Sequence, residues 1–163
     1  MRRGLAGLGS RREEIEAILH GDPLGHPLHV MLTDVPLGAW TTAVVCDALG
    51  LVTKGETWPA AARAAVGVGL AGALAAAAPG LADWSRISSG PARRVGLVHA
   101  ALNVGVIGLF VASLARRPER GRGSALAGYA LLLVSARLGG ELVYRYGVGV
   151  AAPAVAAEED RAA

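Results

Sequence analysis

Four long apolar runs alternate with short polar segments along the chain. The runs cover about residues 30–52, 60–81, 95–115 and 124–143. Each has roughly the 20 residues that a helix needs to cross a hydrocarbon core of about 30 Å. Because short loops join consecutive runs, the pattern predicts an all-α fold, a four-helix transmembrane bundle in which the chain runs up, down, up and down. Residues 25–150 form this predicted transmembrane domain.

The segments outside the four runs have different patterns. Residues 10–20 mix charged and apolar positions and predict a short amphipathic helix at the membrane surface, within an N-terminal segment of residues 1–24. Ser10 precedes Glu13 by three residues, the spacing of a capping box at a helix start. The alanine-rich residues 151–163 predict a disordered tail.

Composition supports a membrane location and excludes several kinds of site. The chain is 53% hydrophobic with a mean hydropathy of +0.43, which is too apolar for an ordinary soluble domain. Cys46 is the only cysteine, which excludes an internal disulfide, a CxxC zinc site and a cysteine-ligated iron–sulfur cluster. The net charge of +3 comes almost entirely from arginine, which in a membrane protein serves topology and lipid headgroups rather than nucleic acid.

The same composition indicates a cellular location. Abundant alanine, glycine and arginine are typical of a high-GC bacterium, so we expect a bacterial inner-membrane protein. The arginines in the loops slightly favour a cytoplasmic N-terminus. No internal repeat is strong enough to indicate an inverted-repeat transporter.

Polar residues inside the spans gather toward one membrane surface. In an up-down-up-down bundle, the starts of the first and third spans lie at the same surface as the ends of the second and fourth. These places hold His26, His29, Asp83, His99, Asn103, Arg137 and Glu141. Because polar groups in a bilayer are costly and usually face the bundle interior, we expect this half of the bundle to carry the function.

His29 and His99 are the candidate ligands. Imidazoles from two parallel helices at matching depth could bind haem b or a transition metal. Around them, His26, Asp83, Asn103 and Glu141 could orient the ligands or carry protons. In the alternative interpretation the histidines bond carboxylates or carbonyls, and the polar cluster fixes helix register in a non-catalytic scaffold. No residue is assigned to catalysis, and we expect no enzymatic activity of the chain's own.

An intramembrane ion pair is also predicted. Asp34 and Arg137 lie at comparable depths in the first and fourth spans, so we expect them to pair. The alternative is that Arg137 pairs with Glu141, four residues later in the same helix.

Five short motifs spread over residues 15–150 carry a family resemblance: GHPLH at 25–29, TDVPLGAW at 33–40, GLADW at 80–84, GLVHA at 96–100 and GGELVY at 139–144. Together they resemble an uncharacterised bacterial family of four-helix membrane proteins. Some members are fused to a Rieske-type iron–sulfur domain, which implies electron transfer. Relatives often carry histidine in place of Glu141, which implies a metal-binding or proton-handling position. No cysteine/histidine cluster follows the fourth span here, so the expected partners are the bilayer, a separate redox protein and further copies of the chain.

Overall fold

The computed structural model describes residues 2–149 and is entirely helical over that range. Its elements are α1 (Arg2–His20), the short 3-10 helix η1 (Asp22–Leu24), α2 (Leu28–Val52), α3 (Thr57–Ser85), α4 (Gly90–Leu114) and α5 (Pro118–Tyr144). The last four are each long and apolar enough to cross a membrane. The predicted fold class is therefore confirmed, and the predicted tail at 151–163 lies outside the described residues.

The spanning helices continue past the apolar runs that predicted them. α4 begins at Gly90 instead of 95, and α5 begins at Pro118 instead of 124. Hydropathy marks only the part inside the hydrocarbon, whereas backbone hydrogen bonding continues into the polar boundary. Ser89 caps α4 by accepting a hydrogen bond from the Ala92 N–H at 3.5 Å, and Pro118 suits the first turn of α5.

The N-terminal helix is longer than predicted. α1 begins at Arg2, so the prediction that Ser10 caps it was wrong. A tight turn at Gly21 and Gly25, with φ of 80° and 65°, then leads into α2. A Cβ at Gly21 would lie 2.0 Å from the carbonyl oxygen of His26, so this turn requires glycine.

Outward faces of the four spans carry large apolar side chains. Leu74 and Leu81 on α3 are 65% and 66% exposed, and Val104 on α4 is 71% exposed. Such faces are costly in water and suited to lipid chains, so the chain is a multi-pass membrane protein in contact with the bilayer.

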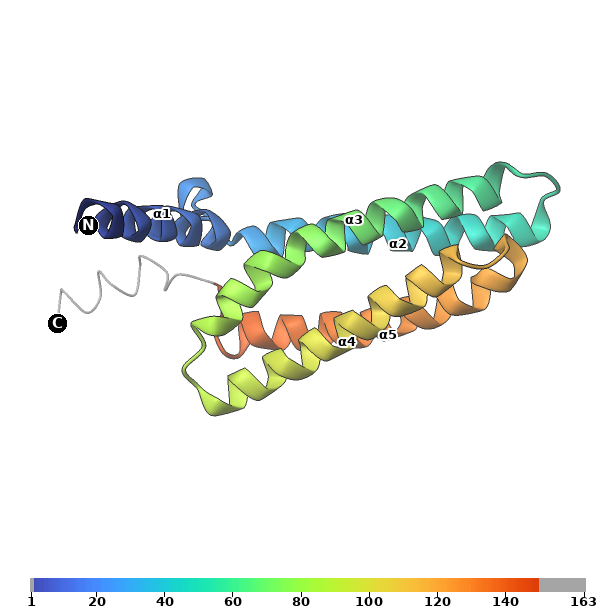
Figure 1. Cartoon of the computed structure of the whole chain (residues 1–163). Helices are drawn as coiled ribbons and strands as arrows, with labels where there is room; N and C mark the ends of the chain where they lie inside the picture. Colours follow the sequence, from blue (N-terminus) through green and yellow to red (C-terminus); the bar gives the residue numbers. More distant parts are fainter. Residues whose placement is uncertain (1, 150–163) are drawn as a thin grey trace.

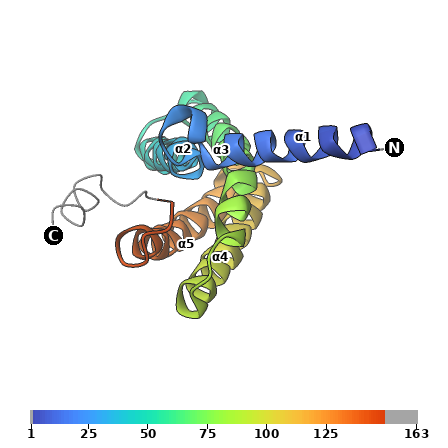
Figure 2. The same ribbon diagram turned by 90° about the vertical axis from the view of Figure 1, so that its left-hand side faces the viewer.

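The spans form two helical hairpins, α2–α3 and α4–α5, with far more extensive packing within each hairpin than between them. Figures 1 and 2 show the hairpins close together at the end that holds the α2–α3 and α4–α5 loops, and spread apart at the other end. In the half of the bundle where the hairpins lie close together, the Trp40 ring stacks on the Phe110 ring, with 4.2 Å between ring centroids and 9° between ring planes. The hydroxyls of Thr41 and Tyr129 lie 3.1 Å apart beside this core.

The two hairpins repeat the same packing. α2 matches α4 with a spacing of 70 residues, which aligns Trp40 with Phe110. α3 matches α5 with a spacing of 59 residues, which aligns Gly69 with Gly128. A Cβ at Gly69 would lie 2.3 Å from Nε1 of Trp40, and one at Gly128 would lie 3.1 Å from Cε2 of Phe110. Each aromatic ring therefore packs on a glycine of its own hairpin.

Contacts between the hairpins are reciprocal as well. Arg63 of α3 donates to the carbonyls of Leu114 at 2.8 Å and Arg116 at 3.0 Å, at the end of α4. Its match on α5, Arg122, donates to the Gly50 carbonyl at 3.4 Å, at the end of α2. Each hairpin thus places the matched arginine of its second helix against carbonyls at the end of the other hairpin's first helix, which is the contact pattern of an approximate two-fold axis along the bundle. The repeat is parallel, not inverted.

Candidate functional site

The polar residues predicted to gather in one half all lie in the spread half of the bundle. His29 is near the start of α2, Asp83 near the end of α3, His99 within α4 and Glu141 near the end of α5. They form several separate contacts there instead of one cluster.

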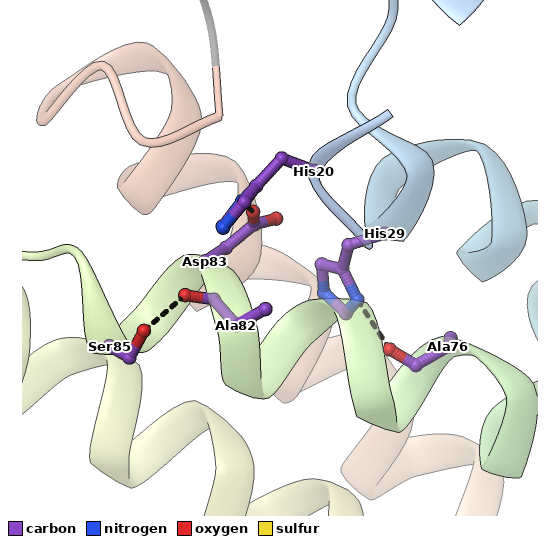
Figure 3. Close-up of polar contacts among 6 residues, drawn as sticks. All are labelled: His20, His29, Ala76, Ala82, Asp83 and Ser85. Carbon is purple, nitrogen blue, oxygen red and sulfur yellow. Dashed lines mark hydrogen bonds and ion pairs between the residues drawn. The ribbon is translucent and has the colours of Figure 1, made fainter. Parts of the chain in front are cut away.

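His29 bonds across its own hairpin. Its Nδ1 lies 2.9 Å from the carbonyl oxygen of Ala76 on α3, as Figure 3 shows. The ring occupies space that glycine leaves, because a Cβ at Gly80 would lie 2.7 Å from Nδ1 and Cε1. A carbonyl only accepts, so Nδ1 carries the proton and Nε2 of the neutral ring keeps its lone pair. Among the described residues, none forms a hydrogen bond with this Nε2.

His99 repeats this arrangement in the second hairpin. Its Nδ1 lies 2.9 Å from the carbonyl oxygen of Ser135, which matches Ala76. Its Cε1 would lie 3.1 Å from a Cβ at Gly139, which matches Gly80. Two differences separate the sites. Nε2 of His99 accepts a hydrogen bond from Asn103 Nδ2 at 3.0 Å. The Ser135 hydroxyl, which Ala76 lacks, also lies 3.0 Å from Nδ1 of His99 and donates to the His99 carbonyl at 3.3 Å.

Both histidines lie on the same faces of α2 and α4 as the stacked rings. His29 precedes Trp40 by eleven residues, and His99 precedes Phe110 by the same number, which is about three turns and returns to the same face. The stacked rings mark the axis, so the imidazoles lie about 16 Å farther along it, in the spread half.

Asp83 contacts His20 of α1, a histidine outside the predicted ligand set. Its carboxylate lies 2.7 Å from Nδ1 of His20, and these side chains are only 13% and 9% exposed. This contact joins α1 to α3, and no periodicity in the sequence indicated it because the residues are far apart in the chain. His26 is exposed, with Nδ1 3.1 Å from the Leu24 carbonyl, so it belongs to the turn and not to the His29 site.

The predicted pair between Asp34 and Arg137 is not formed among residues 2–149. Arg137 Nη1 lies 4.0 Å from Glu141 Oε2, and Arg145 donates to Glu141 Oε1 at 2.8 Å. Asp34 is exposed on α2. The alternative within one helix prevails because residues four apart are already neighbours, whereas the hairpins spread apart at this depth.

The donor set limits what the site could bind. Within the described part of the chain, no three His, Cys, Asp or Glu side chains come close enough to hold a metal ion together. The sole cysteine, Cys46, is buried in α2. The imidazoles of His29 and His99 could ligate the iron of a haem, or supply two ligands to an ion that takes its others from elsewhere.

Comparisons with known proteins agree with the membrane fold. Residues 25–152 match the model of a family described as "Predicted membrane protein (DUF2231)", a range that includes all four spans. The chain matches no curated protein and no solved structure. What the site does must therefore be argued from its residues.

Proposed function

The chain belongs to the DUF2231 family of predicted membrane proteins, and on that premise we propose that it is a small redox subunit of the bacterial inner membrane. His29 and His99 would bind haem b or a transition-metal ion. The observation that supports this proposal is the matched pair of Nδ1–carbonyl hydrogen bonds, at 2.9 Å in both hairpins. These hydrogen bonds fix the orientation of both rings, whose Nε2 atoms occupy equivalent positions beside the two-fold axis.

The hydrogen bonds suit metal ligation. A histidine that ligates a metal usually donates its other ring N–H to a carbonyl or carboxylate, which fixes the tautomer and the ring orientation. Both imidazoles have this support before any ligand binds. Haem or a redox-active ion held there would supply one-electron transfer, with a separate redox protein as donor or acceptor. The N-terminus would face the cytoplasm.

Asn103 makes the two ligands unequal. Its amide competes for Nε2 of His99, while His29 has no such competitor among the described residues. Removing this competitor should therefore tighten ligand binding, and Asn103→Ala is the corresponding variant.

Histidine-to-asparagine variants test the proposal. The asparagine amide nitrogen is as many bonds from Cα as Nδ1 is, so His29→Asn keeps a donor for the Ala76 carbonyl and removes Nε2. Protein purified from haem-supplied and metal-supplied cells should show a Soret band or a stoichiometric metal, lost in His29→Asn and in His99→Asn. A colourless, metal-free wild-type preparation that remains folded would contradict the proposal.

A structural scaffold is the second candidate, and the same hydrogen bonds support it. Each one links two helices of a hairpin, and interhelical hydrogen bonds in membranes contribute about 0.6–2 kcal/mol. On this hypothesis His29→Ala lowers the free energy of unfolding by about 1 kcal/mol and His29→Asn restores most of it. The wild-type protein then shows neither a Soret band nor bound metal.

A further inference from the structure

A pocket of about 470 Å³ lies on the surface of the last turns of α5. Its lining residues are Arg137, Gly140, Glu141, Tyr144 and Arg145. The arginine side chains are 77% and 70% exposed, while the glutamate between them is 21% exposed. Because all five residues come from the end of one helix, the pocket is an open hollow on the protein surface.

The charges in this pocket favour an anion. Glu141 lies 2.8 Å from Arg145 and 4.0 Å from Arg137, so one carboxylate faces two guanidinium groups and the pocket keeps a net positive charge. Each guanidinium has five N–H donors, of which the carboxylate uses only part. The remaining N–H donors of each planar guanidinium match the geometry of phosphate oxygens.

The fold does not require this charged set. The positions on α3 that match Arg137 and Glu141, 59 residues earlier, are Ala78 and Ala82. The α2–α3 hairpin nevertheless forms the same histidine–carbonyl and aromatic–glycine contacts as the α4–α5 hairpin. Because one copy of the hairpin packs without these charges, their presence on α5 calls for an explanation other than folding.

The pocket lies at the boundary of the membrane. Arg145 follows the end of α5, whereas Arg137 lies seven residues before Tyr144, which is about 10 Å deeper. Arginine side chains near helix ends extend toward the headgroups. One turn below Arg137, Leu133 and Val134 are 51% and 55% exposed and continue the same face into the hydrocarbon.

We propose that this pocket binds the headgroup of an anionic phospholipid. The phosphate oxygens contact Arg137 and Arg145, and an acyl chain lies along Leu133 and Val134. A free phosphate ion would use only the arginines. The apolar face directly below them therefore favours a lipid over a soluble anion.

Short-chain lipids test this site. Protein purified in an uncharged detergent is titrated with dioctanoyl phosphatidylglycerol, with dioctanoyl phosphatidylcholine and with inorganic phosphate, and binding is measured by calorimetry. Phosphatidylglycerol should bind at least about tenfold more tightly than the other two. Arg137→Gln and Arg145→Gln should each weaken phosphatidylglycerol binding about tenfold, since each removes charge-assisted hydrogen bonds.

Arg94→Gln is the matched control, because Arg94 is an exposed arginine near the start of α4, on the same side of the membrane and outside the pocket. It should leave binding unchanged, and Glu141→Gln should keep or tighten it by removing a competing carboxylate. Three results would overturn the proposal: equal binding of both lipids, equal binding of inorganic phosphate, or equal weakening by Arg94→Gln and Arg137→Gln. Thermal unfolding of each variant shows that it remains folded.

Discussion

Gly80 offers a direct test of how the His29 site is built. A Cβ at Gly80 would lie 2.7 Å from both Nδ1 and Cε1 of His29, whereas comfortable contacts between heavy atoms are about 3.5–4.0 Å. In Gly80→Ala the ring must therefore move by about 1 Å. That movement disturbs the 2.9 Å hydrogen bond to the Ala76 carbonyl.

Overpacking of this kind costs about 1–3 kcal/mol, so Gly80→Ala should lower the free energy of unfolding by that amount. Gly139→Ala should cost less, because its Cβ would lie 3.1 Å from Cε1 of His99. Gly67→Ala is the matched control on α3, since nothing lies within 4 Å of its Cβ position. There the better helix propensity of alanine should stabilise the protein by up to about 1 kcal/mol.

Reversible unfolding in mixed micelles of dodecylmaltoside and dodecyl sulfate, followed by circular dichroism, measures these differences. A double-mutant cycle identifies their cause, because Gly80→Ala should cost almost nothing when His29 is already alanine. If Gly80→Ala were as stable as Gly67→Ala, or if its cost were the same in both backgrounds, the close packing of His29 on Gly80 would be refuted.

Two further variants test the contacts between elements. Arg63→Met keeps the apolar stem of the side chain but removes its hydrogen bonds to two carbonyls at the end of α4. It should therefore lower the free energy of unfolding by about 1–2 kcal/mol. A cost no larger than that of the control Arg94→Met would contradict this role. Asp83→Leu, which copies the matched residue Leu142, should release His20 and speed trypsin cleavage after Arg12 without changing unfolding of the four spans. Unchanged cleavage would show that this contact does not hold α1.

Some of the site could be predicted from local spacing. His99 and Asn103 are four residues apart and are hydrogen-bonded, and Arg137 and Glu141 have the same spacing and lie 4.0 Å apart. Helical geometry makes such residues neighbours whatever the rest of the chain does. The contact between His20 and Asp83 could not be found in this way, because it depends on where α1 lies against α3.

The repeat left a signal in the sequence that is weak at each position. His29 with His99, Gly38 with Gly108, Pro59 with Pro118 and Gly80 with Gly139 are identical at the two spacings, but most other matched positions differ. Many apolar residues are interchangeable against lipid and within a core, so most matched positions differ. The pair His29 and His99 keeps a donor for a carbonyl, and the pair Gly80 and Gly139 keeps a glycine beside each ring.

The sequence by itself determined the fold class, the number of spans and the end of the bundle that holds the polar residues. It could do so because lipid demands about 20 apolar residues per helix, and short loops force consecutive helices to alternate in direction. Tertiary structure decided which groups meet: that both histidines bond carbonyls beside a two-fold axis, that Asp83 meets His20, and that Asp34 and Arg137 remain apart. These contacts depend on how the aromatic rings pack on glycines and on how far apart the hairpins lie. Both are results of long-range packing, which the spacing of residues along one helix does not determine.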